Sequence, residues 1–181
     1  MGFDTQPLLE DEKVILYPLQ EADFDALYAV ASDPGIWEQH PNKDRWKKAV
    51  FQTFFEGAMQ SRGAFKIVDK ATGSVIGSTR FYGYNESEKS ISIGYTFYGT
   101  PYWGKGINSG VKAMMLNYAF RYVSKVHFHI GANNIRSQVA IGRLGAEKIA
   151  EDEIPYFGEA PKLNFVYEIT KEKWQARGHK R

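Results

Sequence analysis

Hydrophobic and polar positions follow two different periods along this chain, and the changes of period predict its elements. Residues 14–17 form a short β-prone run that ends at Pro18. From Glu21 the apolar residues recur at helical spacing until Pro34. A second helix is predicted between Asp44, its expected N-cap, and Gly63. Two helices are therefore expected before the main sheet.

The middle of the chain changes to the period of strands. Residues 65–69 and 75–82 are rich in β-branched and aromatic side chains and flank turn residues, which predicts a hairpin. The next segment alternates strictly through Ile91, Ile93, Tyr95 and Phe97, so these four side chains are expected on one face of a further strand. Three adjacent antiparallel strands follow from this pattern.

The strongest helix is predicted after Pro101, where a continuous apolar stripe covers residues 111–123. The remaining predicted elements are a strand, a short helix and two further strands, at residues 126–130, 134–144, 147–150 and 163–169. The predicted order is β-α-α-β-β-β-α-β-α-β-β, an α/β (α+β) chain. Residues 1–181 are expected to form a single domain, with residues 1–12 and 175–181 as flexible ends.

Composition narrows the class of protein. The hydrophobic fraction of 43% is that of a globular protein, and the net charge of +2 comes from interspersed charges, so no nucleic-acid partner is expected. The absence of cysteine excludes disulfides, thiol nucleophiles and thiolate metal sites. No signal-peptide pattern and no apolar run long enough for a membrane span are found. We expect a cytoplasmic protein with no membrane partner, either a monomer or a homodimer.

One segment indicates chemistry. Residues 102–110, YWGKGINSG, lie between the alternating strand and the strongest helix. Gly104 and Gly106 permit a tight turn, and the helix that follows contributes unpaired amides and the positive end of its dipole. Such a loop can hold a phosphate group, to which Lys105 can add a charge.

The glycine loop does not match two common nucleotide-binding motifs. Its spacing misses the G-x-G-x-x-G dinucleotide fingerprint by one residue, and no G-K-[ST] sequence is present. A tight turn from strand to helix without any ligand stays open on the glycines alone.

Four segments, in order, resemble the GNAT acetyltransferases. Residues 103–108, WGKGIN, resemble the family's pyrophosphate loop, Q/R-x-x-G-x-G/A, in the W-G-K-G form of the branch that acetylates the N-termini of ribosomal proteins. Residues 93–95, IGY, resemble the E-I-G-Y strand, and residues 75–77, VIG, the strand before it. Residues 134–137 and 143–146, NIRS and RLGA, resemble the downstream N-x-x-S and K-L-G-F element.

The chain departs from the family pattern at four positions. Trp103 replaces a basic or amide residue, and Asn108 replaces the final Gly or Ala, so side-chain capping by Asn108 is expected to orient the amide there. Ser92 stands where the branch has Glu, and Ile141 occupies the position of the tyrosine that serves many members as proton donor.

The resemblance implies a fold and a cosubstrate. The expected GNAT fold is a mixed, mostly antiparallel sheet of about seven strands flanked by about four helices, which splays apart between the strands at Ile93 and Val126. Acetyl-CoA is expected to enter this gap and to lie against a set of cofactor-binding residues. These are Tyr95, Thr96, Phe97, Trp103, Gly104, Lys105, Gly106, Ile107, Asn108, Ser109, Asn134, Ser137 and Arg143.

The implied reaction is transfer of the acetyl group to a primary amine, either a protein N-terminus or a small molecule. Without a cysteine or a serine elbow, direct attack in a ternary complex is expected. Ser137 is the candidate acid, and the base is not assigned. Histidine or carboxylate side chains near the gap could serve as the base, namely His127, His129, Glu86, Glu151, Asp152 and Glu153. No catalytic metal is expected.

The acceptor is expected to approach from the side opposite the cofactor. Its walls would include Trp37, Trp46 and residues 154–161, although plain packing is the more common role of such aromatic side chains. A different class of function also stays open, because Ser92 and Ile141 depart from the pattern at chemically useful positions. It is a catalytically silent module that binds acyl-CoA for sensing or scaffolding.

Overall fold

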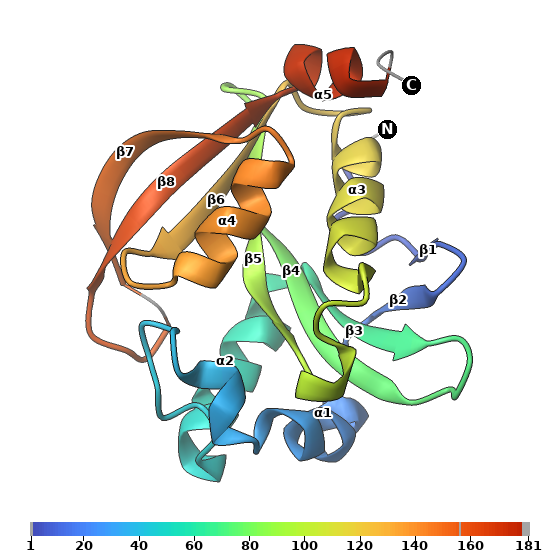
Figure 1. Ribbon diagram of the computed structural model, residues 1–181, viewed down its shortest axis with the longest axis vertical. Coiled ribbons are helices and arrows are strands. Elements are labelled where there is room, and N and C mark those ends of the chain that lie inside the picture. The colour runs from blue at the N-terminus through green and yellow to red at the C-terminus, as the bar shows by residue number, and fades with distance from the viewer. Residues whose placement is uncertain (1, 156, 179–181) are drawn as a thin grey trace.

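The structure, a computed structural model, describes residues 2–155 and 157–178 and contains one mixed sheet (Figure 1). The order of the eight strands across the sheet is β1-β2-β3-β4-β5-β6-β8-β7. Among the described strands, β5 and β6 are the only parallel pair. The strands are β1 (Leu9–Glu10), β2 (Val14–Pro18), β3 (Ala64–Asp69), β4 (Val75–Asn85), β5 (Ser90–Tyr98), β6 (Lys125–Gly131), β7 (Glu147–Ile154) and β8 (Lys162–Thr170).

Helices cover the sheet and occupy its end. The α-helices of the described residues are α1 (Phe24–Ala31), α2 (Lys48–Ser61), α3 (Ile107–Ala119), α4 (Ile135–Arg143) and α5 (Lys171–Gly178). Short 3-10 helices precede three of the longer elements, at Glu21–Asp23, Pro34–Trp37 and Thr100–Tyr102. In Figure 1, α1 and α2 lie together at the bottom of the molecule, whereas α3 and α4 lie above them. No helix in the described ranges is both long and apolar enough to span a membrane.

Strands β5 and β6 pair only at one end. Residues Ser90, Ile91 and Ser92 face Lys125, Val126 and His127 in parallel register, and no pairing of the two strands follows. From Ile93 onward β5 is bonded to β4 on one edge, while β6 continues as the partner of β8. The predicted splay between the strands at Ile93 and Val126 is therefore present.

A bulge in β5 corrects the prediction of strict alternation. The two steps from Ser78 to Arg80 on β4 face three steps from Phe97 to Gly94 on β5, so β5 carries one extra residue. Tyr95 lies at this point with a φ of 54°, in the left-handed region. Ile93 and Phe97, expected on one face, therefore reach different hydrophobic clusters.

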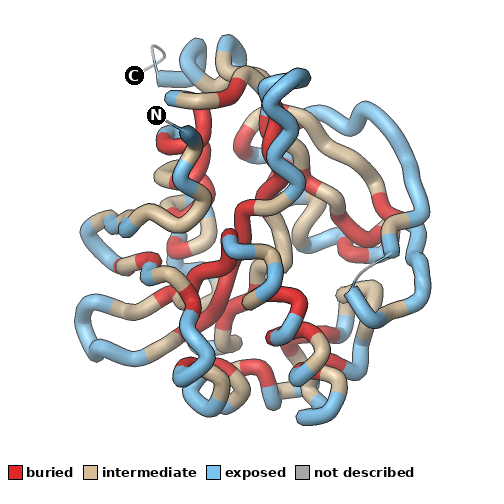
Figure 2. The backbone as a smooth tube through the Cα atoms, turned by 180° about the vertical axis from the view of Figure 1, so that it is seen from behind, coloured by how far each residue is buried: buried red, intermediate tan, exposed pale blue. Residues whose placement is uncertain are grey.

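Two hydrophobic clusters hold the elements together. The larger lies between α3 and the sheet and includes Phe65, Phe81 and Met115, all fully buried. The smaller packs α1 and α2 against the other face through Phe51, Phe54 and Phe97. Figure 2 shows buried positions concentrated in the central strands and helix faces, and exposed ones in loops and along one edge. The fold thus fixes the ends of β5 and β6 between two packed layers.

The α/β class and the order of the predicted elements are confirmed, and the differences lie at the edges. The described residues add β1 and α5, so the counts are eight strands and five α-helices rather than about seven and four. The two ends expected to be flexible carry these elements, and Gln175–Gly178 belong to α5. Residues 179–181 lie outside the described residues. Helix α2 begins at Lys48 with Lys47 as its N-cap, so Asp44 is not the cap.

Candidate active site

A cavity of about 470 Å³ occupies the gap between β5 and β6. This volume is in the range of small-molecule sites. Its wall is built from the splayed strand ends, the loop before α3, the first turns of α3 and α4, and the segment after Trp37, represented by His40 and Pro41. The parallel pair separates at this point, so backbone edges line the cavity where a neighbouring strand would otherwise bond.

The glycine loop forms one mouth of the cavity. Gly104 and Gly106 adopt φ angles of 72° and 75°, conformations that a side chain disfavours. Gly106 is the N-cap of α3 and supplies no side chain to the first turn. The amides of the first turn therefore lack a capping side chain at the positive end of the helix dipole. Gly104, Gly106, Ile107, Asn108 and Ser109 all line the cavity.

One expectation for this loop, capping of the helix by Asn108, is corrected. The Asn108 side chain does not cap the helix, because its Oδ1 accepts a hydrogen bond of 3.0 Å from the hydroxyl of Tyr98. Burial raises the pKa of that phenol, so it remains a donor. Lys105 is not among the cavity-lining residues, and its ammonium lies 5.8 Å from the Tyr102 ring.

A lysine that the sequence reading missed lies at the same loop. The ammonium of Lys13, just before β2, donates a 3.0 Å hydrogen bond to the backbone carbonyl of Lys105. It lies near Gly106, since a Cβ built there would be 3.6 Å from Lys13 Nζ. The two residues are more than ninety positions apart, so no local pattern could have connected them.

The opposite wall comes from β5 and from the start of α4. Tyr95, Thr96 and Phe97 line the cavity on the part of β5 that lies beyond its pairing with β6. Asn134 caps α4, because its Oδ1 accepts a 3.3 Å hydrogen bond from the backbone amide of Ser137. No described residue accepts a hydrogen bond from Nδ2 of Asn134. Ser137 also lines the cavity.

Aromatic and basic groups extend this wall to the surface. The indole of Trp103 donates to the carbonyl of Tyr98 at 3.0 Å, and the guanidinium of Arg136 stacks 3.9 Å above the Trp103 ring. Arg136, Arg143 and Arg177 all line the cavity. No Asp or Glu occurs among the described lining residues, so the charged groups of the cavity wall are cationic.

Lys112, also missed, is the buried cation of this wall. Its side chain is 4% exposed, lines the cavity and donates a 2.6 Å hydrogen bond to Thr96 Oγ1. Burial lowers the pKa of this ammonium to about 7. A signal was available in the sequence, because Lys112 lies three positions before Met115 on the apolar side of the helix.

The two histidines of β6 have different environments. His127 Nε2 lies 2.8 Å from Glu168 on β8, and this residue does not line the cavity. His129 lines the cavity, with its Nε2 3.4 Å from Ser92 Oγ. Desolvation, followed by the nearby His127, lowers the pKa of His129, and Asp152 opposes this shift. His129 is therefore a neutral imidazole at pH 7.

The other candidates lie elsewhere. Glu86, Glu151, Asp152 and Glu153 are exposed and are absent from the cavity wall. The fully buried indole of Trp37 donates to the carbonyl of Ala31, so it is a core residue and not a wall of the acceptor site. Trp46 packs on the same cluster and is absent from the cavity wall. Within the described ranges, no three His, Asp or Glu side chains are grouped to hold a metal ion.

A parallel strand pair that opens beside a glycine-bounded, uncapped helix N-terminus provides an anion site next to a strand edge to which an extended ligand arm can bind. The chain belongs to the GNAT family, because the model of the acetyltransferase (GNAT) domain matches residues 13–147. It is an N-acetyltransferase by this membership, and GNAT domains bind acetyl-CoA.

Similar proteins support the family and the fold. The uncharacterized N-acetyltransferase YoaA of Bacillus subtilis is 24% identical over 91% of this chain and 97% of its own length. A GCN5-related N-acetyltransferase from Brucella melitensis superposes with a TM-score of 0.81 at 18% identity, over 94% of this chain and 81% of that one. A spermidine N-acetyltransferase from Vibrio cholerae, in complex with CoA and spermine, gives a TM-score of 0.66 at 14% identity, over 91% and 99%. These similarities do not select a branch within the family.

Proposed function

We propose that the protein transfers the acetyl group of acetyl-CoA to a primary amine by direct attack in a ternary complex. The observation that carries this proposal is the position of the uncapped N-terminus of α3, with Gly104 and Gly106, at the mouth of the opening between β5 and β6. Positive charge from the helix dipole and unpaired amides favour a diphosphate there.

The cofactor residues divide into three groups along the cavity. The loop of residues 103–109 is proposed to hold the diphosphate, with Lys13 as an added cation. The edge of β5 at Tyr95, Thr96 and Phe97, which β6 does not pair, would bond the pantetheine arm as an added strand would. The Nδ2 group of Asn134 can donate a hydrogen bond to an amide carbonyl of the same arm, and Arg143 adds positive charge at the surface.

The bound cosubstrate supplies an acetyl thioester. The residues of this chain accept one proton from the acceptor amine and donate one to the departing thiolate. His129, neutral and lining the cavity, is proposed as the base that accepts a proton from the acceptor ammonium. Ser137 is proposed as the acid that protonates the departing thiolate, since the side chain of Ile141 has no acidic proton to donate. Amides at the bulge around Tyr95 would polarise the carbonyl. The amine nitrogen bonds to the carbonyl carbon, and the carbon–sulfur bond breaks.

The acceptor is proposed to be a protein N-terminal amine or a small primary amine. An α-amine with a pKa of about 8 is partly neutral at pH 7 and needs little help from a base, whereas a lysine amine needs more. The W-G-K-G form at residues 103–106 supports the branch that acetylates ribosomal-protein N-termini. A cytoplasmic location remains a prediction.

Calorimetry and a thiol-release assay test the proposal together. Titration with acetyl-CoA and with CoA should give saturable binding below millimolar concentration. Release of free thiol against a panel of amines and N-terminal peptides should then reveal turnover. A folded protein with no saturable binding would contradict the assignment of the cavity as the acetyl-CoA site. Binding without turnover of any acceptor would favour a catalytically silent binding module.

A further inference from the structure

Two polar contacts join α3 to β5 along the cavity wall. The hydroxyl of Tyr98 donates a hydrogen bond to Asn108, and the ammonium of Lys112 donates one to Thr96. Asn108 and Lys112 are one helical turn apart on α3, and all four residues line the cavity. Of the α3 residues in the wall, Lys112 lies farthest from the N-terminus of the helix. Only the contact farther from the glycine loop therefore carries a cation.

The ammonium of Lys112 has more donors than the described residues use. An ammonium carries three N–H groups, and Thr96 Oγ1 accepts a hydrogen bond from one of them. No other described residue accepts a hydrogen bond from this ammonium or forms an ion pair with it. Lys112 is 4% exposed, so its remaining donors are poorly solvated, which costs free energy. An acceptor on a molecule bound in the cavity would reduce this cost.

Thr96 holds the ammonium at a fixed place beside β5. Its hydroxyl lies 2.9 Å from that of Thr79 on β4 and 3.4 Å from the carbonyl of Gly94. The Thr79 hydroxyl in turn lies 3.6 Å from the sulfur of Met115 on α3. Contacts from β4, β5 and α3 thus orient the Thr96 hydroxyl to which Lys112 binds. The ammonium lies next to the part of β5 that β6 does not pair.

Lys112 lies between the two ends of the proposed cosubstrate path. One end is the diphosphate site at Gly106, the N-cap of α3. The other is the bulge at Tyr95, directly before Thr96 in the chain, where backbone amides are proposed to polarise the thioester. A pantetheine arm stretched from Gly106 to Tyr95 passes the contact between Lys112 and Thr96. Its amide carbonyls are acceptors of the kind that the unused donors of the ammonium require.

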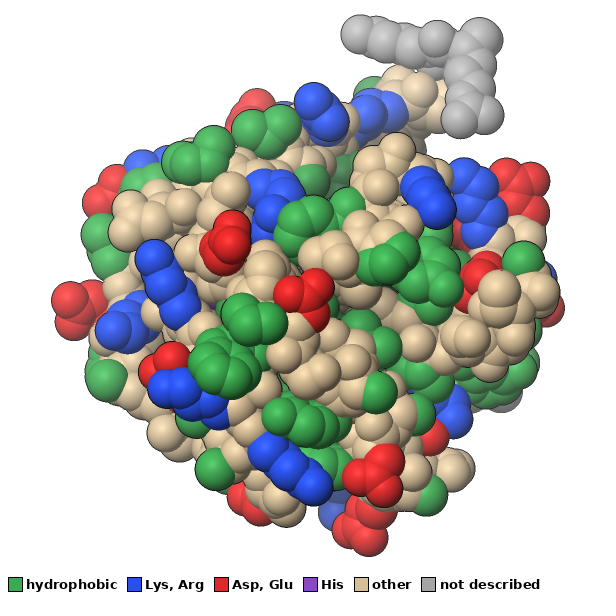
Figure 3. Space-filling view, turned by 60° about the horizontal axis from the view of Figure 1, so that its bottom comes forward, with side chains coloured by type: hydrophobic (Ala, Val, Ile, Leu, Met, Phe, Trp, Pro, Cys, Tyr) green, Lys and Arg blue, Asp and Glu red, His purple; other side chains and the backbone are tan. Residues whose placement is uncertain are grey.

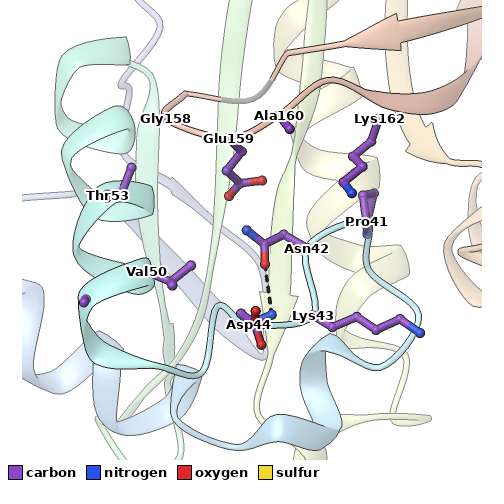
Figure 4. A pocket seen from close by; sticks show the side chains of 11 residues that line it. Pro41, Asn42, Lys43, Asp44, Val50, Thr53, Gly158, Glu159, Ala160 and Lys162 are labelled. Carbon is purple, nitrogen blue, oxygen red and sulfur yellow. Dashed lines mark hydrogen bonds between the residues drawn. The ribbon is translucent and has the colours of Figure 1, made fainter.

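The other hollow of the molecule has a balanced lining. It has a volume of about 570 Å³ and lies between the first turns of α2 and the segment before β8, and Figure 4 shows Glu159 projecting into it. The exposed lysines of its lining, Lys43 and Lys162, are accompanied by Asp44 and Glu159. On the face that includes the lower end of Figure 1, Lys and Arg side chains are likewise interspersed with Asp and Glu (Figure 3). Lys112, by contrast, belongs to a wall without a carboxylate among its described residues.

We infer that Lys112 is a binding residue for the pantetheine arm of the cosubstrate, whose amide carbonyl accepts a hydrogen bond from its ammonium beside Thr96. The inference rests on the proposed function and adds a contact outside the glycine loop and outside the element that begins at Asn134. A hydrogen bond from a charged donor is stronger than one between neutral groups. The bound arm therefore supplies the acceptor that the described residues do not.

The experiment compares two ligands that share the diphosphate and differ in the arm: CoA and its nucleotide half, adenosine 3′-phosphate 5′-diphosphate. Calorimetric titration measures the affinity for CoA, and displacement of CoA measures that for the nucleotide. Lys112→Met should weaken CoA binding by about tenfold and nucleotide binding by less than about twofold, because it removes one charged donor to the arm. Lys112→Gln, which keeps an uncharged donor, should retain part of the affinity for CoA.

The matched control is Lys43→Met, which removes an exposed lysine from the other hollow and should leave both affinities unchanged. Lys112→Met removes a buried, unpaired charge and should fold, which an unfolding curve of the same preparation checks. Unchanged CoA affinity in Lys112→Met, or equal losses for CoA and the nucleotide, overturns the inference while leaving the acetyltransferase intact. Absence of saturable CoA binding in the unmodified protein overturns both proposals.

Discussion

The ammonium of Lys112 on α3 lies 2.6 Å from the hydroxyl of Thr96 on β5, so a buried lysine connects the two elements that form the cofactor side of the cavity. The acceptor of this hydrogen bond is a neutral hydroxyl, and no carboxylate of the described residues pairs with the ammonium. Burial of the charged ammonium therefore lowers the stability of the folded chain. Measuring this loss of stability tests whether Lys112 is buried.

Replacing Lys112 with Met should stabilise the protein at neutral and acidic pH. Burial lowers the pKa of Lys112 to about 7 in the folded chain, against 10.5 for an unperturbed lysine, so the unfolded chain binds more protons between these values. The advantage of Lys112→Met, about 1–4 kcal/mol, should be full below pH 7 and should shrink as pH rises toward 10. Chemical unfolding at pH 6, 8 and 9.5 measures it. A difference in unfolding free energy that does not vary with pH would contradict the burial of this ammonium.

Replacing Gly106 with Val should weaken acetyl-CoA binding by about tenfold. The glycine has a φ of 75°, which costs a residue with a side chain roughly 1–2 kcal/mol, and a Cβ would obstruct the approach of the backbone to the diphosphate. Gly73→Val is the matched control, because Gly73 has a φ of 72° and lies outside the cavity wall. Calorimetry with both variants separates strain from lost contact. Equal affinity in a well-folded Gly106→Val protein would rule out the proposed placement.

Replacing His129 with Gln should lower kcat by about 10²-fold and remove the acidic limb of its pH profile. Desolvation lowers the pKa of His129 below its ordinary value of 6.5, so the base is already neutral and active at pH 6.5 and is lost only at lower pH, where the imidazole takes up a proton. His127→Gln, on the same strand but paired with Glu168 outside the cavity wall, should change kcat little. If both variants retained the profile of the unmodified enzyme, His129 would not be the base.

Replacing Ser137 with Ala should reduce turnover more than cofactor affinity. Ser137 lines the cavity, whereas its contact with Asn134 is made by its backbone amide and survives the change. Steady-state kinetics and calorimetry with acetyl-CoA give the two quantities separately. Unchanged turnover would remove Ser137 from the mechanism, and equal losses in both would make it a cofactor contact.

Features decided by neighbouring residues could be predicted from the sequence. The periods of apolar residues located the hairpin of β3 and β4, helix α3 and strands β6 and β8, because each pattern depends on which face of a single element is buried. The positive φ angles of Gly104 and Gly106 were equally local, since only a short stretch of backbone defines that turn.

The tertiary structure decided which of these residues meet. The bulge at Tyr95 breaks an alternation that looks perfect in the sequence, because one extra residue on β5 is accommodated only by pairing with β4. Lys13 reaches the carbonyl of Lys105, and Arg80 stacks on Tyr95, through contacts between separate elements. The sequence by itself determined the elements and the phosphate-type loop, since these depend on local backbone and side-chain preferences. Packing decided the shape and charge of the cavity, because burial and pairing are set by residues far apart in the chain.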